Sequence, residues 1–223
     1  MALKMGKIAN LIRYAAGLPK SIYVNLRVLP FLQAIRLPII VSRKTKLQSL
    51  SGRVHLNNVK TGLIRIGFGN IEMIDYRYQR TILFLEGNIT FRGKAKIGMG
   101  SRLMITGALD VGENFLISGD GTIICNKKIL IGSNSQMAWE SIVMDTDHHK
   151  IYDENGVYIN EDKEIVIGEK VWIGARSLIL KGSQIADGSI VGANTTISSI
   201  FEEKQGVIVG NPARVVRHNV SWV

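Results

Sequence analysis

The stretch IGEKVWIGARSLILKGSQIADGSIVGANTTI spans residues 167–197 and carries an aliphatic residue at every sixth position. A period of six fits neither an amphipathic helix, which repeats near 3.6 residues, nor a single pleated strand, which repeats at two. It is typical of a chain that turns a corner after every short strand, so that the aliphatic residue points into a narrow prism. Glycine or alanine follows four of the six positions and suits the bends. The six positions are Ile167, Ile173, Ile179, Ile185, Val191 and Ile197.

The same spacing continues upstream in shorter series whose phase shifts, as expected where a turn gains or loses residues. An ordinary β-sandwich would instead need alternating strands joined by hairpin turns, and Asn155-Gly156 is the only Asn-Gly pair in the chain. We therefore predict an all-β fold, a parallel β-helix of hexapeptide repeats. The β-helix domain is predicted over residues 51–223. An N-terminal cap precedes it and consists of a short helix (residues 1–20) and an extended segment with a second short helix (21–50).

Composition limits the class of protein. The chain has 223 residues, 46% apolar and 21% charged, as in one globular body with a sizeable core. No apolar run approaches the length of a membrane span, and Lys7 and Arg13 interrupt any secretory signal, so we expect a cytoplasmic protein. The single cysteine, Cys125, excludes an internal disulfide and is expected to be a buried, inert thiol.

The net charge of +10 comes from the N-terminal third, because residues 1–71 contain 12 Lys or Arg and no Asp or Glu. One interpretation is a solvated basic face. The other is contact of residues 1–46 with an anionic surface, such as the inner leaflet of a membrane. The spacing of apolar residues in LKMGKIANLIRYAAGL favours a basic amphipathic helix that either packs on the body or docks on a membrane. Nucleic acid is not expected as a partner, because no reading motif is present.

The polar segment DTDHHKIYDENGVYINEDKE (residues 145–164) interrupts the repeats and predicts a protruding loop. His148 and His149 stand at its start, where a rigid coil would hold an accessible imidazole. A histidine there can accept a proton from a hydroxyl, and Asp145 or Asp147 could orient it. A solvated histidine pair in a loop is the alternative.

Several phrases resemble the hexapeptide-repeat acyltransferases with a left-handed β-helix, in particular the branch that O-acetylates bacterial surface polysaccharides. The similarity covers most of the chain and is carried by RVLPFLQAIRLPIIVSRKTKL (27–47), IRIGFGN (64–70), AWESIVMDTDHHKI (138–151), VIGEKVWIGARSLILKGSQI (166–185), VGANTTI (191–197) and VGNPARVVR (209–217).

The resemblance implies a homotrimer that binds acetyl-CoA as acyl donor in clefts between subunits and needs no metal. Its catalytic histidine is a general base on a sugar hydroxyl, and the oxygen attacks the thioester without a covalent enzyme intermediate. His149 matches the base, and His148 stands where the branch usually has an aromatic residue. Two adjacent histidines leave the assignment open.

The remaining site residues also follow from the resemblance. Asp145 and Asp147 match the acidic positions, and Trp139 matches a tryptophan on the acceptor side. Backbone groups around Gly174 and Ala175 would contact the pantetheine arm. The adenine and phosphates would be faced by Ala193, Thr195 and the NPAR segment with Arg214 and Arg217, and Lys181 is a further candidate. The acetyl-CoA candidates are Trp172, Gly174, Ala175, Lys181, Ala193, Thr195, Asn211, Pro212, Arg214 and Arg217.

Two other functions are weighed against acyl transfer. A metal enzyme on this fold would need three converging histidines, whereas the chain has four in all and two of them are adjacent. A non-catalytic scaffold or glycan-binding protein in a polysaccharide-assembly complex is the principal alternative.

Overall fold

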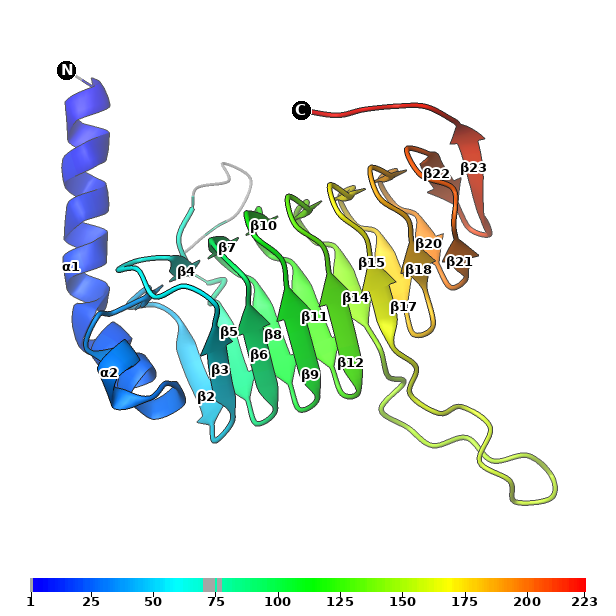
Figure 1. The fold of residues 1–223 in the computed structure, drawn as a ribbon, viewed down its shortest axis with the longest axis horizontal. Coiled ribbons are helices and arrows are strands. Elements are labelled where there is room, and N and C mark those ends of the chain that lie inside the picture. Colours follow the sequence, from blue (N-terminus) through cyan, green and yellow to red (C-terminus); the bar gives the residue numbers. More distant parts are fainter. Residues whose placement is uncertain (1, 70–74, 76–77) are drawn as a thin grey trace.

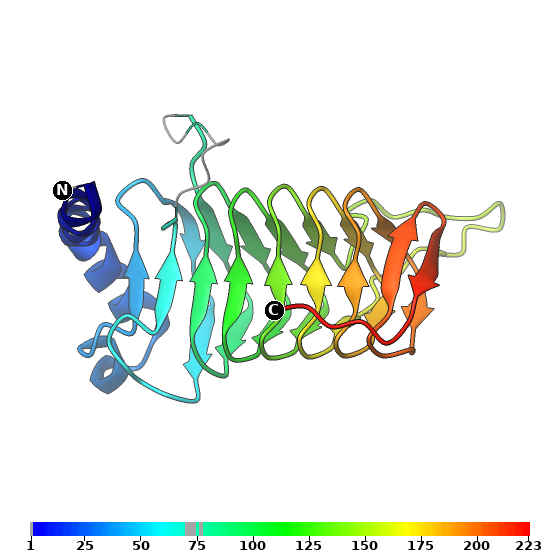
Figure 2. The same cartoon turned by 90° about the horizontal axis from the view of Figure 1, so that it is seen from above.

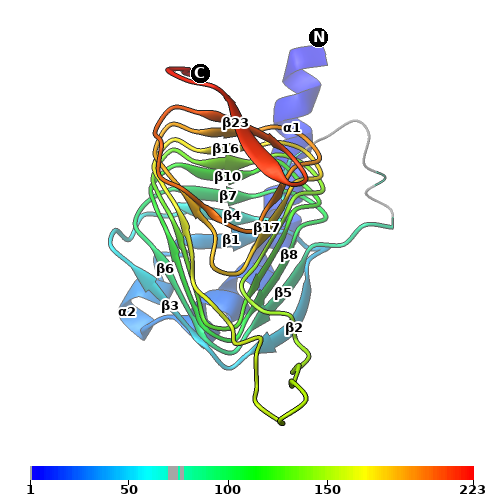
Figure 3. The same cartoon turned by 90° about the vertical axis from the view of Figure 1, so that its right-hand side faces the viewer.

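The computed structural model describes residues 2–69, 75 and 78–223 and forms a parallel β-helix with two helices at its N-terminal end (Figure 1). Met1 of the predicted helix and Asn70 of the 64–70 motif lie outside the described residues. Three sheets make the faces of a prism, seen end-on in Figure 3. Along each face a strand pairs in parallel with the strand three places further along the chain, as β7 (Ala95–Ile97) does with β10 (Phe115–Ile117). The predicted left-handed β-helix is confirmed.

The first sheet ends in an antiparallel pair, formed by β22 and β23. Among the strands in the described residues, no other pair is antiparallel. In order, its other strands are β1 (Ile39–Val41), β4 (Ile64–Ile66), β7, β10, β13 (Gln136–Met137), β16 (Trp172–Ile173) and β19 (Ile190–Val191), followed by β22 (Val207–Gly210) and β23 (Ala213–Arg217).

The other two sheets are parallel throughout. The second contains β2 (Lys46–Leu50), β5 (Ile82–Leu85), β8 (Arg102–Ile105), β11 (Thr122–Cys125), β14 (Ile142–Met144), β17 (Leu178–Leu180) and β20 (Thr196–Ile197). The third contains β3 (Arg53–Leu56), β6 (Asn88–Phe91), β9 (Ala108–Val111), β12 (Lys128–Ile131), β15 (Ile165–Ile167), β18 (Gln184–Ile185) and β21 (Ile200–Phe201).

The core of the prism is made by the inward residue of each short strand. All six repeating aliphatic positions between 167 and 197 are buried. The small corner residues are required by the stacking of the coils, because a Cβ on Gly174 would lie 2.6 Å from the carbonyl oxygen of Val191 in the next coil. The six-residue period therefore follows from the stacking of coils within a single chain.

The N-terminal helix α1 (Ala2–Val28) is longer than the sequence predicts, since the prediction ended it at residue 20. Pro19 lies within it, and polar Ser21 and Asn25 are buried in its last turns rather than ending it. The amide of Asn25 donates to the carbonyl of Ile39 (2.6 Å) and accepts from its N–H (3.1 Å). The Ser21 hydroxyl accepts from the N–H of Val41 at 2.8 Å. Because these side chains satisfy the free edge of β1, tertiary contacts keep the segment helical.

A second helix, α2 (Phe31–Ala34), follows α1, and the first coil of the prism begins with β1. The strands β1 and β2 thus lie within residues 1–50, which the sequence analysis assigned to the cap. No helix in the described ranges is long and apolar enough to cross a membrane.

The loop of residues 145–164 leaves the prism between β14 and β15 and extends away from it (Figures 1 and 2). Its tip is closed by an antiparallel bridge between Tyr152 and Tyr158. The predicted interruption of the repeats is confirmed.

Candidate active site

The first acidic residue of the loop, Asp145, is fully buried and supports the backbone. Its carboxylate accepts hydrogen bonds from the N–H groups of Asn126 (2.6 Å), Lys127 (2.9 Å) and Lys128 (2.7 Å) in the turn below. A carboxylate that accepts three N–H bonds is held in one orientation. Asp145 therefore anchors the start of the loop, and the structure does not place it against a histidine ring.

The second acidic residue, Asp147, lies at the centre of a polar network on the surface. It accepts hydrogen bonds from Lys181 (2.5 Å) and from the amide of Asn160 (2.8 Å). These bonds hold the pKa of its carboxyl below the ordinary value. Lys181 also donates to the carbonyl of Asn160 at 2.7 Å, so the two ends of the loop and the coil after β17 are tied together. The ammonium of Lys181 thus serves this loop, and its place among the acetyl-CoA candidates stays a prediction.

Both histidines are exposed beside this network. The backbone N–H of His149 donates to the carbonyl of Asp147 (2.7 Å), and its carbonyl accepts from Asn160 (2.9 Å). His148 has a positive φ of 61°, a conformation uncommon for residues with a side chain. The main chain at both histidines is thus fixed, while their imidazoles face solvent.

Several predicted acetyl-CoA and acceptor residues form a column on another edge of the prism. Trp139, Ala175 and Ala193 lie in successive turns between the first and second sheets. The N–H of Arg176 donates to the carbonyl of Trp139 (3.1 Å), and that of Asn194 to the carbonyl of Ala175 (2.8 Å). The histidine loop leaves at the next edge, between the second and third sheets. A single chain therefore does not bring the column and the histidines together.

Two members of the predicted set have structural contacts. Gly174 is buried under the next coil, so its lack of a side chain already has a packing reason. Thr195 is 1% exposed, and its hydroxyl accepts from the N–H of Gly210 at 3.1 Å. A direct contact of the Thr195 side chain with a ligand does not fit this burial.

The C-terminal hairpin carries the last predicted residues. Asn211 and Pro212, joined by a cis peptide bond, form its turn, and Arg214 and Arg217 lie exposed on β23. The tail then runs back across the first sheet (Figure 2), where Trp222 packs against Trp172 with ring centroids 6.2 Å apart. These two arginines are accessible to an anion.

Candidate metal ligands and the single thiol were considered next to the histidines. Within residues 2–69, 75 and 78–223 no group of three or more His, Cys, Asp or Glu is placed to hold a metal ion. Cys125 is buried, and burial together with the field of Asp145 raises the pKa of its thiol to about 12.

Two features were missed by the sequence analysis. Asn160 holds Asp147 and His149, but it stands in the polar loop without any spacing that marks it. A row of large apolar side chains also faces outward from the second sheet, where neighbouring strands bring them into register. Its members are Phe84, Met104, Ile124, Met144 and Leu180.

The structure thus combines a prism of hexapeptide coils with a protruding loop that carries two accessible histidines. The bacterial transferase hexapeptide model (six repeats) matches residues 164–199. The chain belongs to this family, because similarity to relatives extends over most of its length.

Three relatives show the extent of that similarity. An uncharacterized 24.8 kDa protein in the cps region of Klebsiella pneumoniae is 30% identical over 89% of this chain and 87% of its own length. A putative colanic acid biosynthesis acetyltransferase of Escherichia coli is 30% identical over 65% of this chain and 77% of its own. The polysialic acid O-acetyltransferase of Neisseria meningitidis is 40% identical over 47% of this chain and 49% of its own.

Among solved structures, the polysialic-acid-specific acetyltransferase NeuO shares the fold. The TM-score is 0.64 at 20% sequence identity, over 83% of this chain and 81% of that one.

Proposed function

We propose that this protein transfers an acetyl group from acetyl-CoA to a hydroxyl of a bacterial surface polysaccharide or its precursor. The observation that carries the proposal is the pair of accessible imidazoles at the root of a loop whose backbone is fixed by Asp145, Asp147 and Asn160. The acetyltransferase names of the relatives from E. coli and N. meningitidis support the reaction class and the carbohydrate acceptor.

His149 is the proposed base, with His148 as the neighbouring alternative. The imidazole removes the proton from the acceptor hydroxyl while the oxygen bonds to the acetyl carbonyl carbon. The bond from that carbon to sulfur breaks, and the imidazolium returns the proton to the departing thiolate. No covalent intermediate on the protein is needed. Asp147 and Lys181 act as positioning residues, because their contacts are with the loop and not with a ring.

A homotrimer is part of the proposal. The histidines and the column of Trp139, Ala175 and Ala193 occupy different edges of one prism. A second copy that packs its column beside the loop would complete the site. The outward apolar row from Phe84 to Leu180 offers partly exposed surface of the kind that subunit contacts cover. The accessible Arg214 and Arg217 suit the phosphates of acetyl-CoA.

We also propose a cytoplasmic location with contact to an anionic inner leaflet through residues 1–46. One side of α1 packs on β1, while apolar side chains on its other sides stay exposed, and α2 continues this exposure. The two earlier alternatives, packing and docking, are thus compatible on different faces of one helix. The exposed aliphatic residues and phenylalanine of these two helices and the residue after them are Leu11, Ile12, Leu18, Ile22, Leu26, Phe31, Leu32 and Ile35.

The catalytic assignment is tested with His149→Ala and His148→Ala, compared as a matched pair on adjacent residues. Thiol release from acetyl-CoA is followed with de-O-acetylated colanic acid and polysialic acid as acceptors. We expect His149→Ala to lower the rate by about 10²- to 10⁴-fold, as for loss of a general base, and His148→Ala to retain most activity. The reverse result moves the role to His148, and full activity in both variants rules out the mechanism.

The scaffold alternative is tested by calorimetry. Saturable binding of acetyl-CoA near one site per chain supports a transferase. A folded trimer that binds neither acetyl-CoA nor longer acyl-CoAs favours a non-catalytic scaffold.

A further inference from the structure

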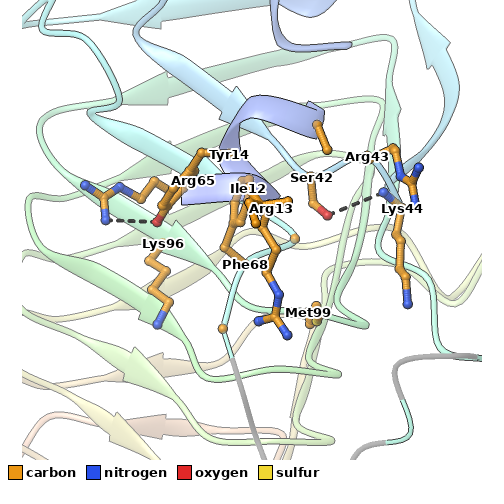
Figure 4. Close-up of a pocket in the computed structure, with 13 residues that line it drawn as sticks. Ile12, Arg13, Tyr14, Ser42, Arg43, Lys44, Arg65, Phe68, Lys96 and Met99 are labelled. Atoms are coloured by element: carbon orange, nitrogen blue, oxygen red, sulfur yellow. Dashed lines mark hydrogen bonds between the residues drawn. The ribbon is translucent and has the colours of Figure 1, made fainter. Parts of the chain in front are cut away.

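A pocket of about 480 Å³ lies where α1 passes the first coils of the prism, far along the chain from the histidine loop (Figure 4). Its walls come from α1, the turn after β1, the segment after β4, and the coil around β7. This volume falls in the range of small-molecule sites, about 300–1,000 Å³. The pocket shares no residue with the proposed acetyl-transfer site.

The lining of the pocket is strongly basic. Five cationic side chains contribute to it, and none of its described lining residues is acidic. Arg13, Arg43, Arg65 and Lys96 take part in none of the ion pairs formed between described residues. In Figure 4 the charged ends of Arg13, Lys44 and Lys96 lie on one side of the Tyr14–Phe68 pair. Like charges gathered in one hollow repel each other, and a bound anion would relieve that repulsion.

Further cations surround the turn that forms one wall. Lys20 donates to the carbonyls of Arg43 (2.8 Å) and Thr45 (2.5 Å), and Arg80 donates to the carbonyl of Lys44 (3.3 Å). Burial lowers the pKa of Lys20, and the charge of Arg80 lowers it further. The positive potential therefore extends beyond the lining itself.

One of the cations is held in place by an aromatic wall. Tyr14 packs on the buried Phe68 with ring centroids 4.6 Å apart. The guanidinium of Arg65 lies 5.6 Å from the Tyr14 ring centroid, and its Nη1 donates to the Tyr14 hydroxyl at 3.3 Å. A guanidinium fixed in this way loses little side-chain freedom on binding. The apolar wall also gives a ligand a surface for more than its charged group.

We infer that this pocket binds a phosphate-type anion, the phosphate or diphosphate group of an organic ligand. Three guanidinium groups and the Lys96 ammonium provide more positive charge than a single carboxylate requires, and arginine forks match the oxygens of phosphate. The phosphate can belong to a lipid headgroup or to a soluble molecule. The lipid source is compatible with the exposed Ile12 in the pocket lining and the exposed Leu11 next to it in the chain.

Two double variants of equal charge change test the site. Arg13→Gln/Lys96→Gln removes two lining cations, one on α1 and one on β7. Arg27→Gln/Lys94→Gln removes one cation from the same helix and one just before the same strand, neither of which lines the pocket. Inorganic pyrophosphate is titrated into each full-length protein by calorimetry without coenzyme A, whose own diphosphate could occupy the pocket. Any coenzyme A phosphate site elsewhere is unchanged in both variants and contributes equally to both titrations. The test remains valid if the protein does not bind coenzyme A.

We expect the pocket variant to bind pyrophosphate at least tenfold more weakly than the control variant, which should resemble the unmodified protein. Equal weakening in both variants, no binding by the unmodified protein, or equally tight binding of citrate would overturn the inference. Sedimentation with phosphatidylcholine vesicles, with and without phosphatidic acid, identifies the source. A loss of phosphatidic acid-dependent binding in the pocket variant alone points to a lipid headgroup, and unchanged vesicle binding with weakened pyrophosphate binding points to a soluble phosphate.

Discussion

The regular coils of residues 165–197 and the loop of residues 145–164 that precedes them follow different rules. In the coils, every sixth residue is buried by the same geometry, and a residue's role follows from its place in the repeat. In the loop, two aspartates two positions apart have different roles. Asp145 is buried under three backbone N–H groups, whereas Asp147 is exposed and binds Lys181. In the coils, residues at the same position of the repeat therefore have the same role. In the loop, the role of each residue depends on its own contacts.

The largest difference between the two regions should appear in a matched pair of isoleucines. Ile179 is fully buried between coils, and Ile151 is 51% exposed in the loop. We expect Ile179→Ala to lower the free energy of unfolding by about 2–5 kcal/mol, because it leaves a cavity in the prism. Ile151→Ala should change it by less than about 0.5 kcal/mol. Urea unfolding measures both, and equal losses would show that the loop packs as tightly as the coils.

The next difference lies inside the loop. Asp145→Asn places an amide N–H₂ against backbone donors, so we expect a loss of about 2–3 kcal/mol of stability. Asp147→Asn should cost less than about 1 kcal/mol, because the Asp147 carboxylate is solvent-accessible. Relative to the stability that each variant loses, the rate of acetyl transfer should fall more in Asp147→Asn than in Asp145→Asn. The Asp147→Asn protein should stay folded but transfer acetyl groups more slowly. Thermal unfolding and thiol release on the same samples separate the two effects; a stable Asp145→Asn protein would contradict the anchoring role.

The smallest effect concerns pH. The pKa of Asp147 is lowered in the folded protein, so its contribution to stability is complete above the ordinary carboxyl pKa of about 3.9 and is lost as the pH falls through the lower folded value. The stability difference between the unmodified protein and Asp147→Asn should therefore be constant from about pH 7 to 5 and shrink below about pH 4. Urea midpoints across this range give the curve. If the stability difference between the two proteins disappeared between pH 7 and 5, a titratable group other than Asp147 would be responsible for it.

Much of the fold was predictable because the period of six is a local property. It identified the inward residues from Ile167 to Ile197, and the break in it located the loop. The left hand of the coil came from the family resemblance, since a period has no handedness. The true length of α1 was not predictable, because Ser21 and Asn25 resemble helix-ending residues until their partners on β1 are known.

The site was predictable in part for the same reason. The histidines follow directly from the break in the repeats, but the separate duties of Asp145 and Asp147 depend on contacts with residues 126–128 and 181. The basic pocket combines segments near residues 13, 43, 65 and 96, which no local pattern connects. Short-range information thus identifies coils and interruptions, and contacts across coils decide what each polar residue does.

The side-chain bonds from α1 to β1 also bear on how such a molecule can change in length. Ser21 and Asn25 occupy the hydrogen-bonding positions that another strand would take, and at the far end the antiparallel strand β23 presents Arg214 and Arg217. Charged or occupied edges discourage pairing with a second chain. The helix α1 and the strand β23 both lie outside the repeating coils. Whole coils can therefore be gained or lost between them without exposing a new unpaired edge of the first sheet. The number of coils in such a prism can therefore vary while both edges of its first sheet stay protected.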